Sequence, residues 1–405
     1  MRLAVVTIIA LAASGRAVAD DAAPVAVTLA DVLAAVPKAP AAQVGGHEVA
    51  AANASIDAAG AWPAPALHFQ TNRLTAHVVG GVTLPLPLFG TVGAARREAE
   101  ARARATRSEV DLGLRDVRRR AVMAWLALAR SDGELDAATK AAAQSAELER
   151  IARGRLDAGV GAEVDVTAAR AAHARADLAV ANAKRALEAA SADLAGVVGW
   201  NPLRLLHADG ALPGGDSPSL EALRGKLAAH PERTVAQRRI EAADATVDQI
   251  RSQRRPGLAL EAQVSIDDPT TPGTDAMVGL SLDLPLFSRV GAHARSAQAT
   301  AAAERARLAV TEATLGSGLV ASYRRWQAAT EKLAALLRDV VPAQERAAAL
   351  SAQAYREGAR DLASALQADR DLAAVRAEVN AARTDVAAAW IELQVAAGEE
   401  VGSAH

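Results

Sequence analysis

Strict alternation of apolar and polar side chains marks two pairs of segments in this chain. Residues 257–267 and 276–287 place an apolar side chain at every second position, with polar or charged residues between them. Residues 66–73 and 78–88 show the same alternation with a shorter connection. Because successive side chains of a strand point to opposite faces, the pattern predicts two β-hairpins with one apolar and one polar face. These runs are about as long as the roughly 9–11 residues of a membrane-barrel strand.

The segments that follow each pair of strands have the periodicity of very long helices. Residues 91–158 contain no proline, and their charged residues recur at helical spacing. About 68 helical residues form a rod of roughly 100 Å, because each residue advances the helix by about 1.5 Å. We predict further helices at 162–198, 288–357 and 361–397, with a kink at Pro342. Leucine and valine spaced among alanines favour antiparallel coiled-coil packing, so the predicted fold class is mainly α with a small β part.

The order of these elements repeats, which divides the chain into two equivalent units. Residues 82–89 (VTLPLPLF) recur as residues 280–287 (LSLDLPLF). We predict a first unit at 20–212, a second unit at 213–398 and a carboxy-terminal tail at 399–405. Four strands cannot close a barrel alone, and open strand edges cannot face lipid. The sheet is therefore either soluble or completed by further copies of the chain.

The amino-terminal residues have the features of an export signal. Arg2 precedes an apolar run at 3–13, and Ala17 and Ala19 form a small-x-small cleavage site. We predict a cleaved signal peptide at 1–19; the alternative is a membrane anchor, although the run is shorter than the ~20 residues that a spanning helix needs. The chain has no cysteine, and its net charge of −2, with both signs interspersed, provides no basic face for nucleic acid.

Together these features resemble the TolC-like outer-membrane efflux channels. The resemblance rests on the duplication, on the Pro-Leu-Phe strand endings and on the turn after each long helix. Residues 355–360 (YREGAR), followed by Leu362 and Leu366, are similar to the family's Tyr-x-x-Gly-x-Arg turn. Residues 159–166 (GVGAEVDV) are similar to its counterpart in the first repeat. The moderate length and the absent lipid-bearing cysteine look like the heavy-metal-cation branch, while drug efflux and protein secretion stay open.

The resemblance implies an assembly, a location and a function. It implies a homotrimer in the outer membrane of a Gram-negative bacterium, in contact with outer-membrane lipid. Each chain would give four strands to a twelve-stranded transmembrane β-barrel and its long helices to a periplasmic α-barrel. The trimer would be a passive exit duct, supplied by a periplasmic adaptor (a membrane fusion protein) and an inner-membrane pump of the resistance-nodulation-division or ABC type. The alternative is an exported coiled-coil protein that acts as an envelope spacer, which has no need for the two hairpins.

The resemblance also implies a closed periplasmic entrance. By position, Asp165, Tyr355 and Arg360 match residues that link neighbouring helices there, and an aspartate beside an arginine and a tyrosine hydroxyl forms a charge-assisted latch. The alternative is that Asp165 only caps its helix and that Arg360 is solvated. At the two lumen-facing positions where well-known members place acids, this chain has Ser364 and Gln367, so an acidic ring at the constriction is in doubt.

The two turns are the predicted docking tips for the adaptor. Glycine there permits the positive φ with which two long helices reverse direction; the alternative is that the glycines only end the helices. The residues of these docking tips are Gly159, Val160, Gly161 and Ala162 in the first repeat, and Gly358, Ala359 and Asp361 in the second.

No other constellation of residues indicates chemistry. The eight histidines include no pair at the i, i+4 spacing of a helical metal site. No glycine-rich loop has phosphate-binding spacing, and no nucleophile has an identifiable base. We therefore predict no enzyme activity, no cofactor, no dedicated metal site and no nucleic-acid partner.

Overall fold

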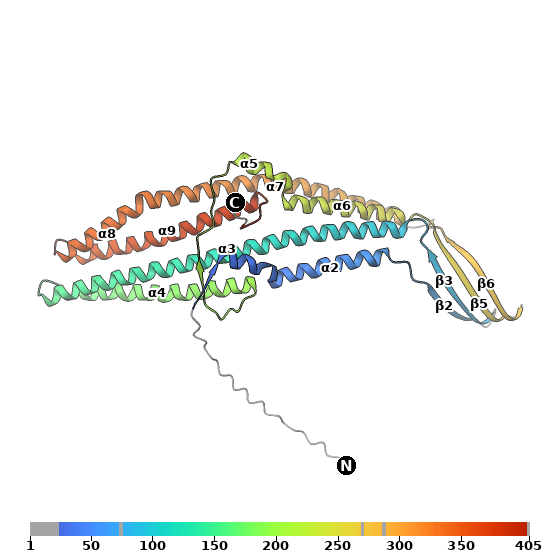
Figure 1. The fold of residues 1–405 in the computed structure, drawn as a ribbon, viewed down its shortest axis with the longest axis horizontal. Coiled ribbons are helices and arrows are strands. Elements are labelled where there is room, and N and C mark those ends of the chain that lie inside the picture. Colours follow the sequence, from blue (N-terminus) through green and yellow to red (C-terminus); the bar gives the residue numbers. More distant parts are fainter. Residues whose placement is uncertain (1–23, 73–75, 269–270, 286–288, 403–405) are drawn as a thin grey trace, which may run out of the picture.

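The chain forms a long, narrow molecule with a small β-sheet at one end and two helical hairpins at the other (Figure 1). The computed structural model describes residues 24–72, 76–268, 271–285 and 289–402. The predicted signal peptide at 1–19 lies outside the described residues, as does the second Pro-Leu-Phe from its leucine onward. Within the described residues, no helix combines the length and the apolar character that crossing a membrane requires.

The sheet is antiparallel, with the strand order β2-β3-β5-β6. Its strands are β2 (Ala66–Asn72), β3 (Ala76–Leu86), β5 (Gly257–Asp268) and β6 (Thr271–Asp283). The register places apolar residues opposite one another across strands: Leu84 pairs with Leu260, which in turn pairs with Leu280. One face is therefore apolar over all four strands, and its side chains are largely exposed. β6 begins at Thr271, five residues before the predicted start, so the second hairpin is longer than its sequence pattern indicated.

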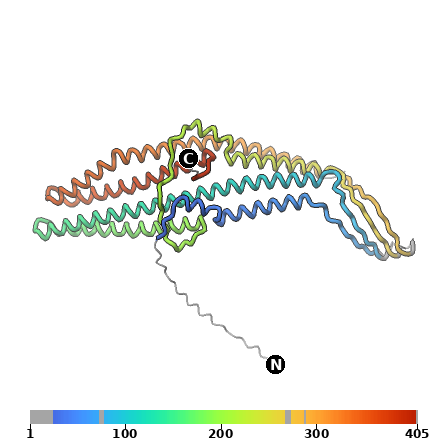
Figure 2. The backbone as a smooth tube through the Cα atoms, in the orientation of Figure 1, coloured from blue at the N-terminus to red at the C-terminus, as the bar shows by residue number. Residues whose placement is uncertain are grey.

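The helices run along the molecule in two layers that mirror the sequence repeat (Figure 2). In the first repeat, α3 (Thr91–Asp157) packs against α2 (Pro40–Gly60) towards the sheet and against α4 (Glu163–Val198) towards the tip. In the second, α7 (Val290–Ala335) packs against α6 (Pro231–Ser252) and α9 (Leu362–Ala396). The stretches before the strands are thus helices of 21 and 22 residues. α3 also contacts α6 and α9, which joins the two repeats.

The long helix of the second repeat is interrupted by one π-helical segment. Leu336–Val340 forms this segment, and α8 (Val341–Arg356) follows it. Pro342 lies at the start of α8, where its missing N–H and its ring disfavour continuous i→i−4 bonding with the preceding turn. The helix predicted at 288–357 is thus observed as α7, the π turn and α8 in direct succession. The interruption lies next to Pro342, where a kink was predicted, and takes the form of a π turn.

Short elements at residues 25–38 and 206–229, which the sequence did not predict, pack against the middle of the long helices; they are called the collar here. β1 (Val25–Thr28) pairs in parallel with β4 (Leu206–Asp209), although the two strands are far apart in sequence. The buried Trp125 donates its indole N–H to the Val27 carbonyl at 2.9 Å. His207 Nδ1 and Ala208 N lie 2.6 and 2.8 Å from the Asp132 carboxylate. The remaining short elements are α1 (Leu29–Ala35), α5 (Leu220–Lys226) and the 3₁₀ turns Val36–Lys38 and Leu227–Ala229.

Candidate gate and docking tips

The two turns that reverse the helical hairpins lie side by side at the end of the molecule farthest from the sheet (Figure 1). Both turns have the same backbone geometry. Gly159 and Gly358 have φ angles of +74° and +79°. In each turn the residue after this glycine donates its N–H to a carbonyl five residues earlier, Val160 to Arg155 at 3.0 Å and Ala359 to Ala354 at 2.8 Å. This Schellman pattern needs a left-handed residue at the glycine position, so the glycines do end the helices.

The first tip exposes apolar surface at its apex. Val160 is 66% exposed and Val164, on the first turn of α4, is 71% exposed. Gly161 lets the turn pack closely against the end of α3, because a Cβ added there would lie only 2.7 Å from the backbone nitrogen of Leu156. Ala162 is the N-cap of α4 and has no side-chain cap bond. A small, rigid apex with exposed valines can contact a partner, and its role as a docking surface stays a prediction.

The second tip uses two of the predicted site residues to begin its return helix. Asp361 is the N-cap of α9, and its carboxylate accepts a hydrogen bond from the Ser364 backbone N–H at 3.3 Å. The Ser364 hydroxyl donates to the same carboxylate. These bonds lower the pKa of Asp361, with a smaller contribution from the charge of Arg360. Asp361 and Ser364 therefore have a structural role in capping, beside the docking and constriction roles predicted for them.

The structure brings together two of the three predicted latch residues. The Tyr355 hydroxyl donates to Asp165 Oδ2 at a long 3.5 Å, and the Tyr355 side chain is almost wholly buried. Burial raises the pKa of Tyr355, and the Asp165 charge raises it further. The hydroxyl thus remains a donor through neutral pH and loses its proton only above the ordinary tyrosine pKa of about 10. Arg360 is exposed; its backbone N–H donates to the Ala354 carbonyl at 3.2 Å, but its side chain makes no hydrogen bond or ion pair with the residues that the structure describes, so its part in the latch stays a prediction.

Arg155 is the residue of this site that sequence reasoning missed. Its Nη1 donates to the carbonyls of Tyr355 at 2.8 Å and Arg356 at 3.2 Å, and its Nη2 donates to the Val160 carbonyl at 3.3 Å. The guanidinium also lies 5.1 Å from the centroid of the Tyr355 ring. One side chain of the first repeat therefore contacts both tips. Arg155 is a basic residue in the last turn of α3. Basic side chains near a helix C-terminus often bind the last carbonyls, so the sequence could have indicated this role.

The predicted constriction residues lie on the first two turns of α9. Gln367 is exposed and donates from Nε2 to Asp371 Oδ1 at 2.8 Å. Asp371 therefore places a carboxylate one turn beyond Gln367 on the same helix. The lining of a constriction depends on neighbouring chains, so the lumen-facing role of Ser364 and Gln367 stays a prediction.

A cavity of about 480 Å³ lies between α3, α8 and α9, behind the tips. Its lining combines apolar residues, most of them alanines, with charged side chains: Glu147, Glu345, Arg356, Asp369 and Arg376. The Ser145 hydroxyl donates to Asp369 at 3.3 Å. Burial raises the pKa of Asp369, although the hydrogen bond from Ser145 and the charge of Arg376 oppose this.

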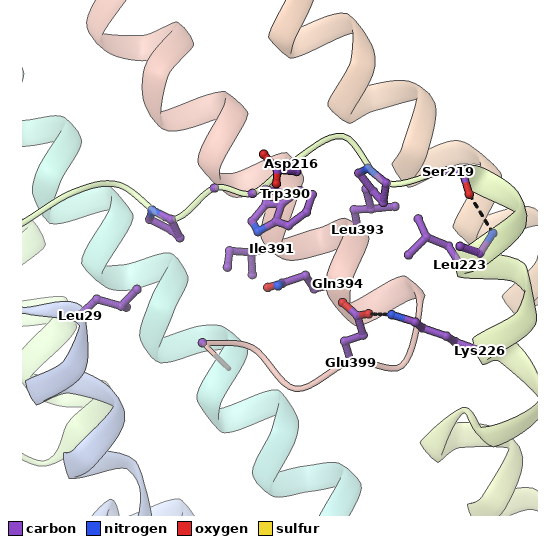
Figure 3. A pocket seen from close by; sticks show the side chains of 16 residues that line it. Leu29, Asp216, Ser219, Leu223, Lys226, Trp390, Ile391, Leu393, Gln394 and Glu399 are labelled. Carbon is purple, nitrogen blue, oxygen red and sulfur yellow. Dashed lines mark hydrogen bonds and ion pairs between the residues drawn. The ribbon is translucent and has the colours of Figure 1, made fainter. Parts of the chain in front are cut away.

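A larger hollow lies at the collar, away from the tips (Figure 3). It has a volume of about 720 Å³, and its walls come from residues 213–219, α5, the end of α9 and the residues after it. Lys226 and Glu399 form an ion pair on one side, and the Ser219 hydroxyl caps α5 by accepting from Ala222 N at 3.2 Å. The segment that joins the two repeats is thus held on α9 next to Trp390 and Gln394.

The chain shares its sequence pattern and its fold with known proteins. The outer membrane efflux protein family matches this chain over residues 35–200 and 224–399. The chain belongs to this family. Its members are efflux channels, which confirms the predicted family and the prediction that the chain is not an enzyme. The two matched stretches also agree with a chain built from two repeats.

Individual relatives are distant. Over 206 residues the chain is 29% identical to the outer membrane efflux protein BepC of Brucella suis biovar 1 (strain 1330), a match that spans 49% of this chain and 45% of that protein. Among solved structures, the Campylobacter jejuni CmeC outer membrane channel superposes with a TM-score of 0.77 at 14% identity, covering 93% of this chain and 87% of that one. The Vibrio cholerae outer membrane protein VceC superposes with a TM-score of 0.74 at 17% identity, covering 92% and 96%. These likenesses confirm the predicted fold class.

Proposed function

We propose that this chain is the outer-membrane exit duct of a tripartite efflux system and acts as a homotrimer. The observation that carries the proposal is the sheet at the end of the family fold. Its edge strands β2 and β6 each pair with one strand among the described residues, and one face is apolar and exposed. Exposed apolar surface of this kind needs lipid or protein to cover it. Strand edges beside lipid need partners, which identical neighbouring chains can supply.

A closed barrel follows from symmetry. Four strands are too few to close a barrel, whereas three copies of the sheet supply twelve. In that arrangement β6 of one chain would pair with β2 of the next, and the long helices would continue below the membrane as a tunnel in the periplasm. The 67 residues of α3 alone extend about 100 Å. The envelope-spacer alternative offers no reason for an apolar-faced sheet.

The partners of the duct follow from the family alone. We propose that a periplasmic adaptor docks on the tips and that an inner-membrane pump, of the resistance-nodulation-division or ABC type, supplies the cargo. The heavy-metal-cation branch is a finer assignment that rests on chain length and the absent cysteine. Among the described residues, no group of three or more histidine, aspartate or glutamate side chains could hold a metal ion. We therefore propose that the pump and the adaptor, rather than the duct, select the cargo.

Purification and electrical recording test the exit duct directly. We expect the exported protein to leave the envelope only with detergent, to run as a trimer and to conduct ions in planar bilayers. Release as a monomer by osmotic shock, without detergent, would contradict the proposal. Removal of residues 1–19 on export is measured in the same preparation by sequencing the amino terminus.

The latch gives a prediction about conductance. Tyr355→Phe removes the hydroxyl that reaches Asp165, and Arg360→Ser removes the charge proposed to reach a neighbouring chain. A hydrogen bond of this kind contributes about 0.5–1.5 kcal/mol, and an exposed ion pair contributes about 0–1 kcal/mol; three-fold symmetry repeats both. We therefore expect the double variant to raise single-channel conductance without a large change in trimer stability.

The other tyrosine of the chain provides the control for the latch. Tyr323 lies 5.9 Å from Trp326 between ring centroids, in the cluster around α5 and α7. Tyr323→Phe should leave conductance unchanged. Equal conductance of the latch variant and the unaltered channel would remove Tyr355 and Arg360 from the gate.

A further inference from the structure

We propose that Arg155 couples the docking surface at the first tip to the Tyr355 latch, so that displacement of one tip releases the other. The inference rests on the proposed function, because it assigns a regulatory step to the same duct. Arg155 is a positioning residue in this scheme. It carries no cargo and acts through the two turns that it joins.

The coupling follows from the rigidity of the guanidinium. Nη1 and Nη2 belong to one planar group, and they hold carbonyls of different repeats, Tyr355 and Val160. The same group lies over the Tyr355 ring, 5.1 Å from its centroid. A partner that shifts the Val160 carbonyl therefore tilts or frees the guanidinium, and the Tyr355 backbone and ring lose contacts together. Tyr355 then no longer has a fixed position from which to reach Asp165.

The second tip packs closely around the Arg155 side chain. The Tyr355 carbonyl, in the last turn of α8, accepts the Gly358 N–H at 3.0 Å as well as Arg155 Nη1. Carbonyls at a helix C-terminus carry partial negative charge, which a permanently charged guanidinium neutralises. A Cβ added to Gly358 would lie only 3.2 Å from Arg155 Nη1. Glycine at this position therefore serves two purposes, since it allows the positive φ of the turn and leaves room for the arginine.

The arrangement can also be displaced. Arg155 Nε is buried and has no hydrogen-bond partner in the described part of the chain. A buried donor without a partner raises the free energy of the state that contains it, which lowers the cost of moving the guanidinium. A cleft of about 560 Å³ between the tips, lined by Arg155, Val160 and Gly358 among others, gives a docking partner access to it.

Spin labels measure the connection between the tips without any partner protein. The chain has no cysteine, so cysteines introduced at Val160 and Ala359 are the only labelled positions. Labelled chains are diluted with unlabelled chains before trimer assembly, and the distance between the two nitroxides is measured by pulsed electron resonance. We expect one narrow distance distribution for Arg155 and a broad one for Arg155→Met. Arg155→Lys should lie between them, because an ammonium group can bind carbonyls but lacks the planar fork that spans both turns.

Arg150→Met is the matched control. Arg150 lies on the same helix, its side chain is 73% exposed, and it pairs with Glu147 one turn away. Its loss should leave the distribution narrow. An equally narrow distribution in Arg155→Met would overturn the proposal; if that variant fails to assemble, an unchanged distribution in Arg155→Lys would do so.

Conductance separates coupling from a purely structural role. We expect Arg155→Met to raise the open probability about fivefold, the factor that the loss of one such contact produces. Adding Tyr355→Phe should then give no further rise, because the tyrosine is already released. Two effects that multiply would show independent contributions and would overturn the coupling. If the unaltered trimer passes no current, the exit-duct proposal fails, while the label distances still decide the role of Arg155.

Discussion

Arginine at Val278 should prevent assembly in the outer membrane, whereas arginine at the adjacent Met277 should be tolerated. Val278 lies in the middle of β6 on the apolar face, opposite Ala262, and is 73% exposed. Met277 lies on the other face, opposite Gln263, and is 62% exposed. A lipid-facing arginine at the bilayer midplane costs about 2–4 kcal/mol, and three-fold symmetry repeats this cost in every trimer. The measurement is the amount of heat-resistant trimer in outer-membrane fractions.

This pair of variants is closely matched. Both positions are exposed in the single chain, are one residue apart and receive the same side chain. They differ only in the face of the strand. Equal yields of trimer from the two variants would mean that the apolar face does not contact lipid, and the sheet would then have to be explained as a soluble structure.

Bulky residues at the two tips should abolish export without affecting assembly. Val160→Trp and Ala359→Trp place large side chains at the apex of each turn, where both native residues are exposed. Loss of one central contact in a protein interface often costs about 2 kcal/mol or more, which is roughly a thirtyfold loss of adaptor affinity. We expect cargo export to fail in cells while the trimer remains in the outer membrane at its normal level.

Leu203 provides the control for the tip variants. It is 91% exposed and lies in the loop after α4, at the opposite end of that helix from the tip. Leu203→Trp adds the same side chain to a similarly exposed site and should leave export intact. Export that survives both tip substitutions would place docking elsewhere on the surface.

The parts of the fold that could be predicted are those that produce a local periodicity of apolar and polar residues in the sequence. The alternation at 257–267 requires a strand with one apolar face, and the observed register aligns those apolar positions across the sheet. The proline-free run at 91–158 likewise predicted α3 almost to its ends. Both features depend only on residues close together in sequence, so one amino-acid sequence was enough to predict them.

The parts that could not be predicted depend on long-range contacts with the backbone. β1 and β4 are strands of four residues, too short to show a pattern, and only the folded helices bring them together. Arg155 binds three carbonyls, and carbonyls are present at every residue, so no side-chain pattern marks its partners. The capping role of Asp361 was readable, because aspartate is one of the preferred residues at a helix N-cap.

The π turn at Leu336–Val340 makes the two repeats mechanically different. α3 runs without interruption from the sheet to its tip, whereas the corresponding path in the second repeat is divided between α7 and α8. An unbroken helix resists bending, and a segment with i→i+5 bonding bends more readily. The first repeat therefore has an unbroken long helix that resists bending, and the second has a long helix that bends more readily at its π turn. Arg155 joins the two repeats at the tips. Once a displaced Arg155 no longer joins the tips, the second hairpin would bend about this joint more readily than the first repeat, whose long helix is unbroken.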